Sequence, residues 1–269
     1  MKNTGGRLNL FEFEILSQVP DLKHFVTSRS GGVSFTPYDS LNLGLHTADN
    51  QEHVLENRAL LASETGIAAD RFLYASQVHS GDVKIIDEEA IANGVLLQNP
   101  QTDATITNLP GICLMVMVAD CVPVLLFDPV KRVSAVVHAG WRGTIHHITR
   151  NTVNKMIDRF GCDAKDIIAG IGPSIGPCCY EVGEEVKAVV RESFGITEGY
   201  LVSQPHSEKP YFDLWYANQK QLTDLGVKPE NIETSQICTK CNHQMFYSSR
   251  ADKGVTGRFA AGIFMVGRV

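Results

Sequence analysis

Short apolar runs recur along this chain, and they predict a series of buried strands. A run that is almost wholly apolar is typical of a strand covered on both faces. Such runs occupy residues 72–74, 112–118, 122–127, 133–137 and 167–171, and further strands are predicted at 24–29 and 83–86. Residues 11–16 begin by alternating apolar and polar positions, which predicts one more, half-buried strand.

Segments with helical periodicity lie between these runs. The first, 50–64, follows a capping Asp49 or Asn50 and ends before Gly66. Further helices are predicted over 144–160, 181–194 and 213–225. Because strands and helices alternate, with neither an internal repeat nor a clear linker, we expect one α/β domain over residues 1–269.

The composition is that of an ordinary globular protein, with 43% hydrophobic and 20% charged residues among 269. A net charge of -6 offers no basic surface, so we expect no nucleic-acid partner. No apolar run reaches the roughly 18 residues of a membrane span, and residues 1–10 lack a signal-peptide core. We expect a cytoplasmic monomer that does not bind membranes, with its seven cysteines as free thiols.

Three of the predicted strands are followed by metal-type ligands. His79 comes shortly after 72–74, Cys121 follows 112–118, and His138 follows the run that ends at Val137. Such distant ligands can meet only if the fold brings them together. Two imidazoles and one thiolate leave zinc an open fourth position, which is the arrangement of a catalytic centre. We predict a zinc site of these three residues, although copper(II) also binds imidazole.

Two other interpretations of the cysteines stay open. Cys121 and His138 would serve equally well as a nucleophile pair without a metal, as in cysteine hydrolases. Cys238 and Cys241 form a Cys-x-x-Cys pair, but a complete structural zinc site needs a second pair. The remaining candidates, Cys178 and Cys179, are adjacent in sequence, so their spacing argues against such a site.

Several motifs together resemble the YfiH/YlmD family, long described as laccase-domain or polyphenol oxidase proteins. The motifs are Gln77-Val78-His79, Ala119-Asp120-Cys121, His138-Ala139-Gly140-Trp141-Arg142-Gly143, Thr27–Ser34, Ser40–Gly44, Gly172-Pro173, Cys179–Gly183 and Thr256-Gly257-Arg258. The resemblance covers nearly the whole chain. One departure is Arg250-Ala251-Asp252-Lys253-Gly254, where many members carry an Arg-Arg or Arg-Asp-Gly type segment.

The resemblance implies a layered α/β/β/α sandwich with mixed sheets and a zinc at the positions of His79, Cys121 and His138. It also implies purine nucleoside phosphorylase activity on adenosine, inosine and S-methyl-5'-thioadenosine, together with adenosine deaminase activity. The substrates would then be purine nucleosides and phosphate.

Phosphorolysis needs an anion site beside the sugar, and deamination needs an activated water. Arg29 with the backbone of Gly31 and Gly32 is the first candidate for phosphate, and Arg142 at a helix start is the second. Asp120 could carry a proton beside Cys121. Gln77 could bind the base or the ribose, since it shares a face with His79 on extended backbone. Asn42, which lies in one of the matching segments, is a further candidate for binding substrate or phosphate.

Three rival functions were weighed against this one. Multicopper oxidase chemistry is discounted, because the nine histidines include no His-x-His pair. An amidase that edits a peptidoglycan precursor would use Cys121 or an activated water against an amide carbonyl. A metal-binding or redox-sensing module without turnover is the non-enzyme alternative.

Overall fold

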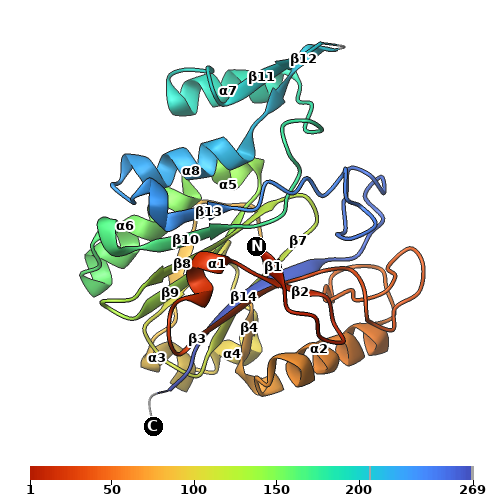
Figure 1. The fold of residues 1–269 in the computed structure, drawn as a ribbon, viewed down its shortest axis with the longest axis vertical. Helices are drawn as coiled ribbons and strands as arrows, with labels where there is room; N and C mark the ends of the chain where they lie inside the picture. The colour runs from red at the N-terminus through yellow and green to blue at the C-terminus, as the bar shows by residue number, and fades with distance from the viewer. Residues whose placement is uncertain (206, 268–269) are drawn as a thin grey trace.

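Two mixed six-stranded sheets lie against each other in the computed structural model, which describes residues 1–205 and 207–267 (Figure 1). The first sheet has the order β1 (Lys2–Asn3), β2 (Leu10–Glu12), β3 (Leu22–Thr27), β14 (Phe259–Met265), β7 (Cys113–Val118), β4 (Phe72–Tyr74). The second has the order β13 (Ile232–Thr234), β10 (Ile168–Ile171), β8 (Val122–Asp128), β9 (Val133–Ala139), β6 (Ala104–Thr107), β5 (Val83–Ile85). Both sheets combine parallel with antiparallel pairs.

Helices and a small hairpin complete the fold. The helices are α1 (Glu14–Ser17), α2 (Gln51–Thr65), α3 (Glu88–Ala92), α4 (Val95–Gln98), α5 (Trp141–Ile145), α6 (Ile148–Phe160), α7 (Glu184–Phe194) and α8 (Leu214–Asp224), with short 3-10 turns η1 (Ala69–Arg71), η2 (Ala164–Asp166) and η3 (Pro229–Asn231). The hairpin pairs β11 (Leu201–Gln204) with β12 (Ser207–Phe212). It projects with α7 at one end of the molecule (Figure 1).

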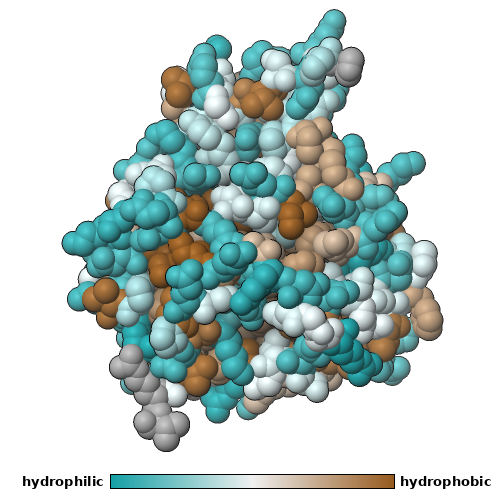
Figure 2. Space-filling view, in the orientation of Figure 1, coloured by the Kyte–Doolittle hydropathy of each residue, from teal (hydrophilic) through white to brown (hydrophobic). Residues whose placement is uncertain are grey.

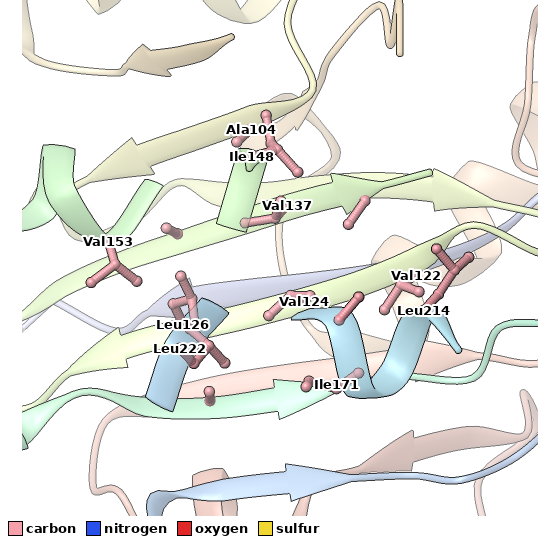
Figure 3. Close-up of a cluster of buried hydrophobic side chains, with 14 of the residues drawn as sticks. Ala104, Val122, Val124, Leu126, Val137, Ile148, Val153, Ile171, Leu214 and Leu222 are labelled. Carbon is pink, nitrogen blue, oxygen red and sulfur yellow. The ribbon is translucent and has the colours of Figure 1, made fainter. Parts of the chain in front are cut away.

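Period-2 alternation explains why the central strands are apolar throughout. In β8, Val124 and Leu126 pack among the residues of α6 and α8, whereas Leu125 and Phe127 pack against the other sheet. Figure 3 shows Leu126 of this strand beside Leu222 of α8. Both faces of the strand are therefore covered, as its composition predicts.

The helix α2 covers the outer face of the first sheet. Its Leu61 packs in one buried cluster with Met115 and Met117 of β7, while Val116 of the same strand faces the second sheet. The order of layers is thus helix, sheet, sheet, helices. This confirms the predicted α/β/β/α fold class with mixed sheets.

The caps of α2 also follow the sequence. The side chain of Asn50 accepts a hydrogen bond from the backbone N–H of Glu52, and Gly66 ends the helix with a left-handed φ of 63°. On the face shown in Figure 2, hydrophilic residues cover most of the surface and hydrophobic ones form separate patches. Among the described residues, no helix has the length and apolar character that crossing a membrane requires.

Two predicted elements were wrong in extent. The strand expected at 11–16 stops at Glu12, because the backbone N–H of Phe13 turns to donate to His24 Nε2 and α1 follows. The helix expected over 144–160 is two helices, since His147 has a left-handed φ of 57° and separates α5 from α6. The helix α5 already begins at Trp141, immediately after Gly140.

Candidate active site

His79, Cys121 and His138 meet at one end of the two sheets. His138 lies near the end of β9, Cys121 lies in the turn between β7 and β8, and His79 lies in the loop after β4. Their ligand atoms all lie within 4.8 Å of one another, with Cys121 Sγ 4.0 Å from His79 Nε2. The sequence predicts that the fold brings these three side chains together, and in the structure they do meet.

Gly140 permits this close approach. A Cβ atom at this position would lie 3.0 Å from Cys121 Sγ and 3.1 Å from His79 Cδ2. Any other residue would therefore push against both ligands. The glycine after the strand is needed for space at the cluster rather than for an unusual backbone angle.

Asp103, which the sequence analysis did not single out, holds two of the three ligands. Its Oδ1 accepts a hydrogen bond from His138 Nδ1 at 2.8 Å and from the backbone N–H of His79 at 3.0 Å. Ser80 N–H donates to Oδ2 at 2.7 Å. Burial opposes ionisation of Asp103, but these hydrogen bonds outweigh it and lower the carboxyl pKa to about 2. An ionised carboxylate cannot donate, so Nδ1 of His138 carries the proton and Nε2 is the ligand atom.

Cys121 and His138 polarise each other. Burial raises the pKa of the Cys121 thiol, but the charge of His138 and hydrogen bonds from both histidines outweigh it and lower that pKa to about 6. Burial lowers the pKa of His138, but the Cys121 thiolate and Asp103 raise it to about 9. The thiol is therefore poised to be a thiolate at neutral pH, the form that binds metals or attacks electrophiles.

The cluster fits a zinc ion. Zinc bonds of about 2.3 Å to sulfur and about 2.0 Å to nitrogen place tetrahedral S and N ligands about 3.5 Å apart. The observed 4.0 Å between Cys121 Sγ and His79 Nε2 is close to this value. The carboxylate of Asp103 behind His138 is the partner that metal-bound histidines commonly have.

The cluster opens into a cavity of about 910 Å³. Its walls include His46, Tyr74, Gln77, Asp120, Ile175, Tyr180 and Ser249, and its cationic residues are Arg58, Arg250, Lys253 and Arg258. Such a volume lies in the range of small-molecule sites. Aromatic rings and cations thus share one cavity with the three metal-type ligands.

Two predicted site residues line the cavity but have structural partners. Gln77 donates through Nε2 to the carbonyl of Met117 and accepts from the N–H of Met117 through Oε1. Asp120 accepts from Thr239 Oγ1 at 2.6 Å and from the backbone N–H of Arg250 at 2.7 Å. Both side chains hold segments of the cavity wall together, which favours positioning roles.

The other predicted substrate residues lie outside the cavity wall. The guanidinium of Arg29 donates to the carbonyls of Asp39 and His243 and lies over the ring of Tyr247. Arg142 lies over the ring of its neighbour Trp141. Neither arginine therefore lies in the wall of the cavity that the metal-type ligands share.

The glycines and Asn42 serve the local fold. A Cβ on Gly32 would lie 2.3 Å from the carbonyl oxygen of Ser40, and a Cβ on Gly31 would lie 2.8 Å from the side chain of Leu8. Buried Asn42 accepts hydrogen bonds from the backbone N–H groups of Gly44 and Arg258. It fixes the backbone of a cavity arginine without lining the cavity itself.

Arg58 and Arg258 are cavity residues that sequence reasoning missed. Arg58 lies on α2, and its guanidinium lies 3.7 Å from the ring centre of Tyr74. Burial lowers the pKa of His46, and the charges of Arg258 and Arg58 lower it further. These two arginines form a cationic group beside the metal-type cluster, and His46, whose lowered pKa favours the neutral imidazole, lines the same cavity. Arg258 belongs to the Thr256-Gly257-Arg258 motif of the family resemblance, and this motif was the one sequence feature that could have indicated its place in the site.

A layered α/β sandwich with an open set of metal-type ligands at a cationic cavity defines an enzyme site for anionic or polar small molecules. A family model described as multi-copper polyphenol oxidoreductase laccase matches residues 23–266. The chain therefore belongs to this family, and the predicted resemblance to YfiH and YlmD is confirmed.

Individual relatives agree with this assignment. A purine nucleoside phosphorylase of Bacteroides thetaiotaomicron is 34% identical over 256 residues, covering 94% of this chain and 95% of that protein. Adenosine deaminase RL5 of an unknown prokaryotic organism is 34% identical over 260 residues, covering 96% and 99%. The crystal structure of YlmD from Geobacillus stearothermophilus superposes with a TM-score of 0.89 at 32% identity, covering 99% and 98%. The prediction that this chain is an enzyme is confirmed.

Proposed function

We propose that this protein is a zinc-dependent purine nucleoside enzyme that catalyses two reactions. In phosphorolysis, phosphate attacks the ribose carbon that bears the purine, releasing the base and ribose 1-phosphate, or its methylthio analogue. The substrates would be adenosine, inosine and S-methyl-5'-thioadenosine. In deamination, water replaces the amino group of adenosine, giving inosine and ammonia. The open cluster of His79, Cys121 and His138 beside a cationic cavity carries the proposal.

The donor set supports zinc as the metal. Two imidazoles and a thiolate match the donors of catalytic zinc, and all three side chains line the cavity, from which water or substrate could reach a bound ion. A zinc ion held there would lower the pKa of water, which is the chemistry that deamination needs. Asp103 holds His138 in the tautomer that binds through Nε2.

The cationic group of Arg58 and Arg258, with His46 on the same cavity wall, is our candidate phosphate site. Arg58 is stacked on Tyr74 and donates to the carbonyl of Leu43, so its guanidinium plane is fixed. Asn42 fixes the backbone N–H of Arg258. Fixed guanidinium groups bind phosphate oxygens with directed, charge-assisted hydrogen bonds.

Another part of the cavity wall suits the purine. Tyr180 presents an aromatic ring at the cavity, and the Arg250 guanidinium lies 5.2 Å from its centre. An aromatic ring offers a stacking surface to a planar base. Asp120 and Gln77 hold the surrounding backbone, so we assign them positioning roles, and Cys121 a ligand role.

Incubation of the zinc-loaded protein with adenosine and phosphate tests the proposal. We expect adenine and ribose 1-phosphate in the presence of phosphate, and inosine with or without phosphate. Chelation followed by readdition of zinc, or of copper, identifies the active metal. If fully zinc-loaded, folded protein forms neither product, the proposal is contradicted.

One observation favours a second candidate function. A thiolate-prone Cys121 beside His138, which is held by Asp103, has the arrangement of a cysteine hydrolase. Amide hydrolysis by this thiolate would survive removal of the metal, whereas the nucleoside reactions would not. Activity on a peptidoglycan-type amide by chelator-treated protein distinguishes the two.

A further inference from the structure

A second cluster of metal-type ligands, made of four cysteines, lies outside the cavity wall. Cys178 and Cys179 belong to the segment between β10 and α7, and Cys238 and Cys241 belong to the segment after β13. The four sulfur atoms lie within 4.8 Å of one another, although 62 residues separate Cys179 from Cys241. The expectation that adjacent cysteines have the wrong spacing for a shared site was wrong, because the chain turns tightly at 177–179.

We infer that these four cysteines form a second metal site, which holds a tetrahedral zinc ion. Zinc bonds of 2.3 Å to four sulfurs place the sulfurs about 3.8 Å apart. Cys241 Sγ lies 3.7 Å from Cys178 Sγ and 3.4 Å from Cys179 Sγ. Zinc is the ion that four-sulfur tetrahedral sites typically hold in structural roles.

Backbone contacts preorganise the cluster. The N–H of Gly176 donates to Cys238 Sγ at 3.3 Å. Ser174 and Cys238 form an isolated bridge, and the N–H of Thr239 donates to the carbonyl of Ser174. Outer hydrogen bonds of this kind orient metal ligands. The two segments are therefore held together independently of the four sulfurs.

A single disulfide accounts for the arrangement less well. It would use two sulfurs at about 2.05 Å and leave the other two unexplained. A thioredoxin-type role would place the Cys-x-x-Cys pair at the start of a helix. Residues 238–241 instead enter a series of turns that leads to 246. One divalent ion uses all four thiolates.

The site would fasten two parts of the cavity wall. Ile175 and Tyr180 lie on the first cysteine segment, and Ser249 and Arg250 lie on the segment that follows the second. Arg250 Nη1 also donates to the carbonyl of Glu181 at 3.2 Å. The second ion would thus act at a distance from the reaction, by positioning. Its presence does not depend on the proposed nucleoside chemistry.

Metal content tests the inference without an activity assay. Wild-type protein purified with zinc and reductant should contain two zinc ions per chain, measured by mass spectrometry of the metal. A Cys121→Ala/His138→Ala variant should keep one. Adding Cys178→Ser and Cys241→Ser should remove it, whereas a Cys162→Ala control should keep both ions. If the Cys121→Ala/His138→Ala protein contains no zinc, the inference is overturned. This test leaves the four cysteines of the cluster unchanged.

Cobalt(II) supplies a second readout. Cobalt-loaded Cys121→Ala/His138→Ala protein should show the strong thiolate-to-metal absorption and visible bands of a tetrahedral four-sulfur centre. Absence of that absorption in folded, reduced protein would contradict the site. Intact mass without reductant checks the alternative: a loss of two hydrogens with no bound metal would identify a disulfide and overturn the inference.

Discussion

Two clusters of metal-type ligands lie in one molecule, and their surroundings differ. The cluster of His79, Cys121 and His138 offers three ligands at strand ends and in adjoining loops, and it opens into the cavity. The second cluster offers four thiols from two loops, and none of the four cysteines belongs to the cavity wall. The first has a buried carboxylate behind a ligand; the second has backbone N–H support.

This difference shows what separates a reactive centre from a structural one. Both clusters contain cysteine, so the ligand type alone does not decide the role. A set of three leaves a coordination position for water or substrate, and a set of four closes it. We therefore expect substitution of a cysteine to lower turnover when it is made in the first cluster, and to lower thermal stability more than turnover when it is made in the second.

The largest effect is expected for Cys121→Ala. Loss of the thiolate removes the open metal site, so kcat/KM for both adenosine reactions should fall by at least about 1,000-fold. The zinc of the four-cysteine cluster should remain. Steady-state kinetics and metal analysis, with Cys162→Ala as the control, measure both. Undiminished turnover by Cys121→Ala protein lacking metal at the open site would remove the distinction between the clusters.

Asp103→Asn should give the next largest effect. The substitution removes the charge that holds His138 and sets an amide against the N–H groups of His79 and Ser80. Loss of such a partner lowers metal affinity by about 10–100-fold. Competition with a chelator should show weaker zinc at the open cluster only. Equal weakening at both clusters would indicate a general loss of structure instead.

The fold was more predictable from sequence than the site. Strands such as 112–118 are apolar because both faces are covered, so their pattern is local and visible. The three convergent ligands could be predicted because each follows such a strand or lies at its end. Asp103 lies outside every predicted strand and helix, and nothing local in the sequence indicates that its carboxylate faces His138.

Long-range placement explains the other misses. Arg29 stands beside a glycine loop that suggests an anion site, but its guanidinium is bound by carbonyls of distant segments. Arg58 stands in an ordinary helix, and only packing brings it to the cavity. The partnership of Cys178 with Cys241 depends on two loops 63 residues apart. Spacing rules apply to ligands within one loop, and they do not extend to this case.

Arg258→Gln should separate phosphate binding from the metal. We expect the KM for phosphate to rise about tenfold or more, since one charge-assisted contact contributes about 1.5–3 kcal/mol. Deamination, which needs no phosphate, should keep kcat within about threefold. The matched control is Arg29→Gln, which should leave the phosphate KM unchanged. If Arg29→Gln raises that KM and Arg258→Gln does not, phosphate binds elsewhere.

The pH dependence of alkylation should differ between the clusters. In metal-free, reduced protein, Cys121 has a pKa of about 6, below its ordinary value, so its thiolate forms as pH rises through 6. Its rate with iodoacetamide should increase about tenfold from pH 5 to pH 7 and then level off. Burial raises the pKa of Cys179 to about 11, so its rate should still climb above pH 9. Peptide mass spectrometry separates the two, and identical profiles would contradict the contrast.

The smallest effect on turnover is expected for Cys178→Ser/Cys241→Ser, which opens the second cluster. Because backbone hydrogen bonds from Gly176 and Thr239 still join the two loops, kcat/KM at 25 °C should stay within about threefold.

The thermal stability of this variant should change more than its turnover. A cross-link over about 60 residues contributes at most about 4 kcal/mol in the chain-entropy model. At about 2–4 °C per kcal/mol, and with the loops already joined, we expect the unfolding midpoint to fall by about 5 °C or more. Thermal unfolding with and without chelator measures this change. Chelator should lower the unfolding midpoint of the Cys121→Ala/His138→Ala protein by a similar amount. It should lower the midpoint of the Cys178→Ser/Cys241→Ser protein by less. A variant that loses turnover as completely as Cys121→Ala while its unfolding midpoint is unchanged would show that the four-cysteine cluster takes part in the reaction, and the contrast between a reactive and a structural centre would fail.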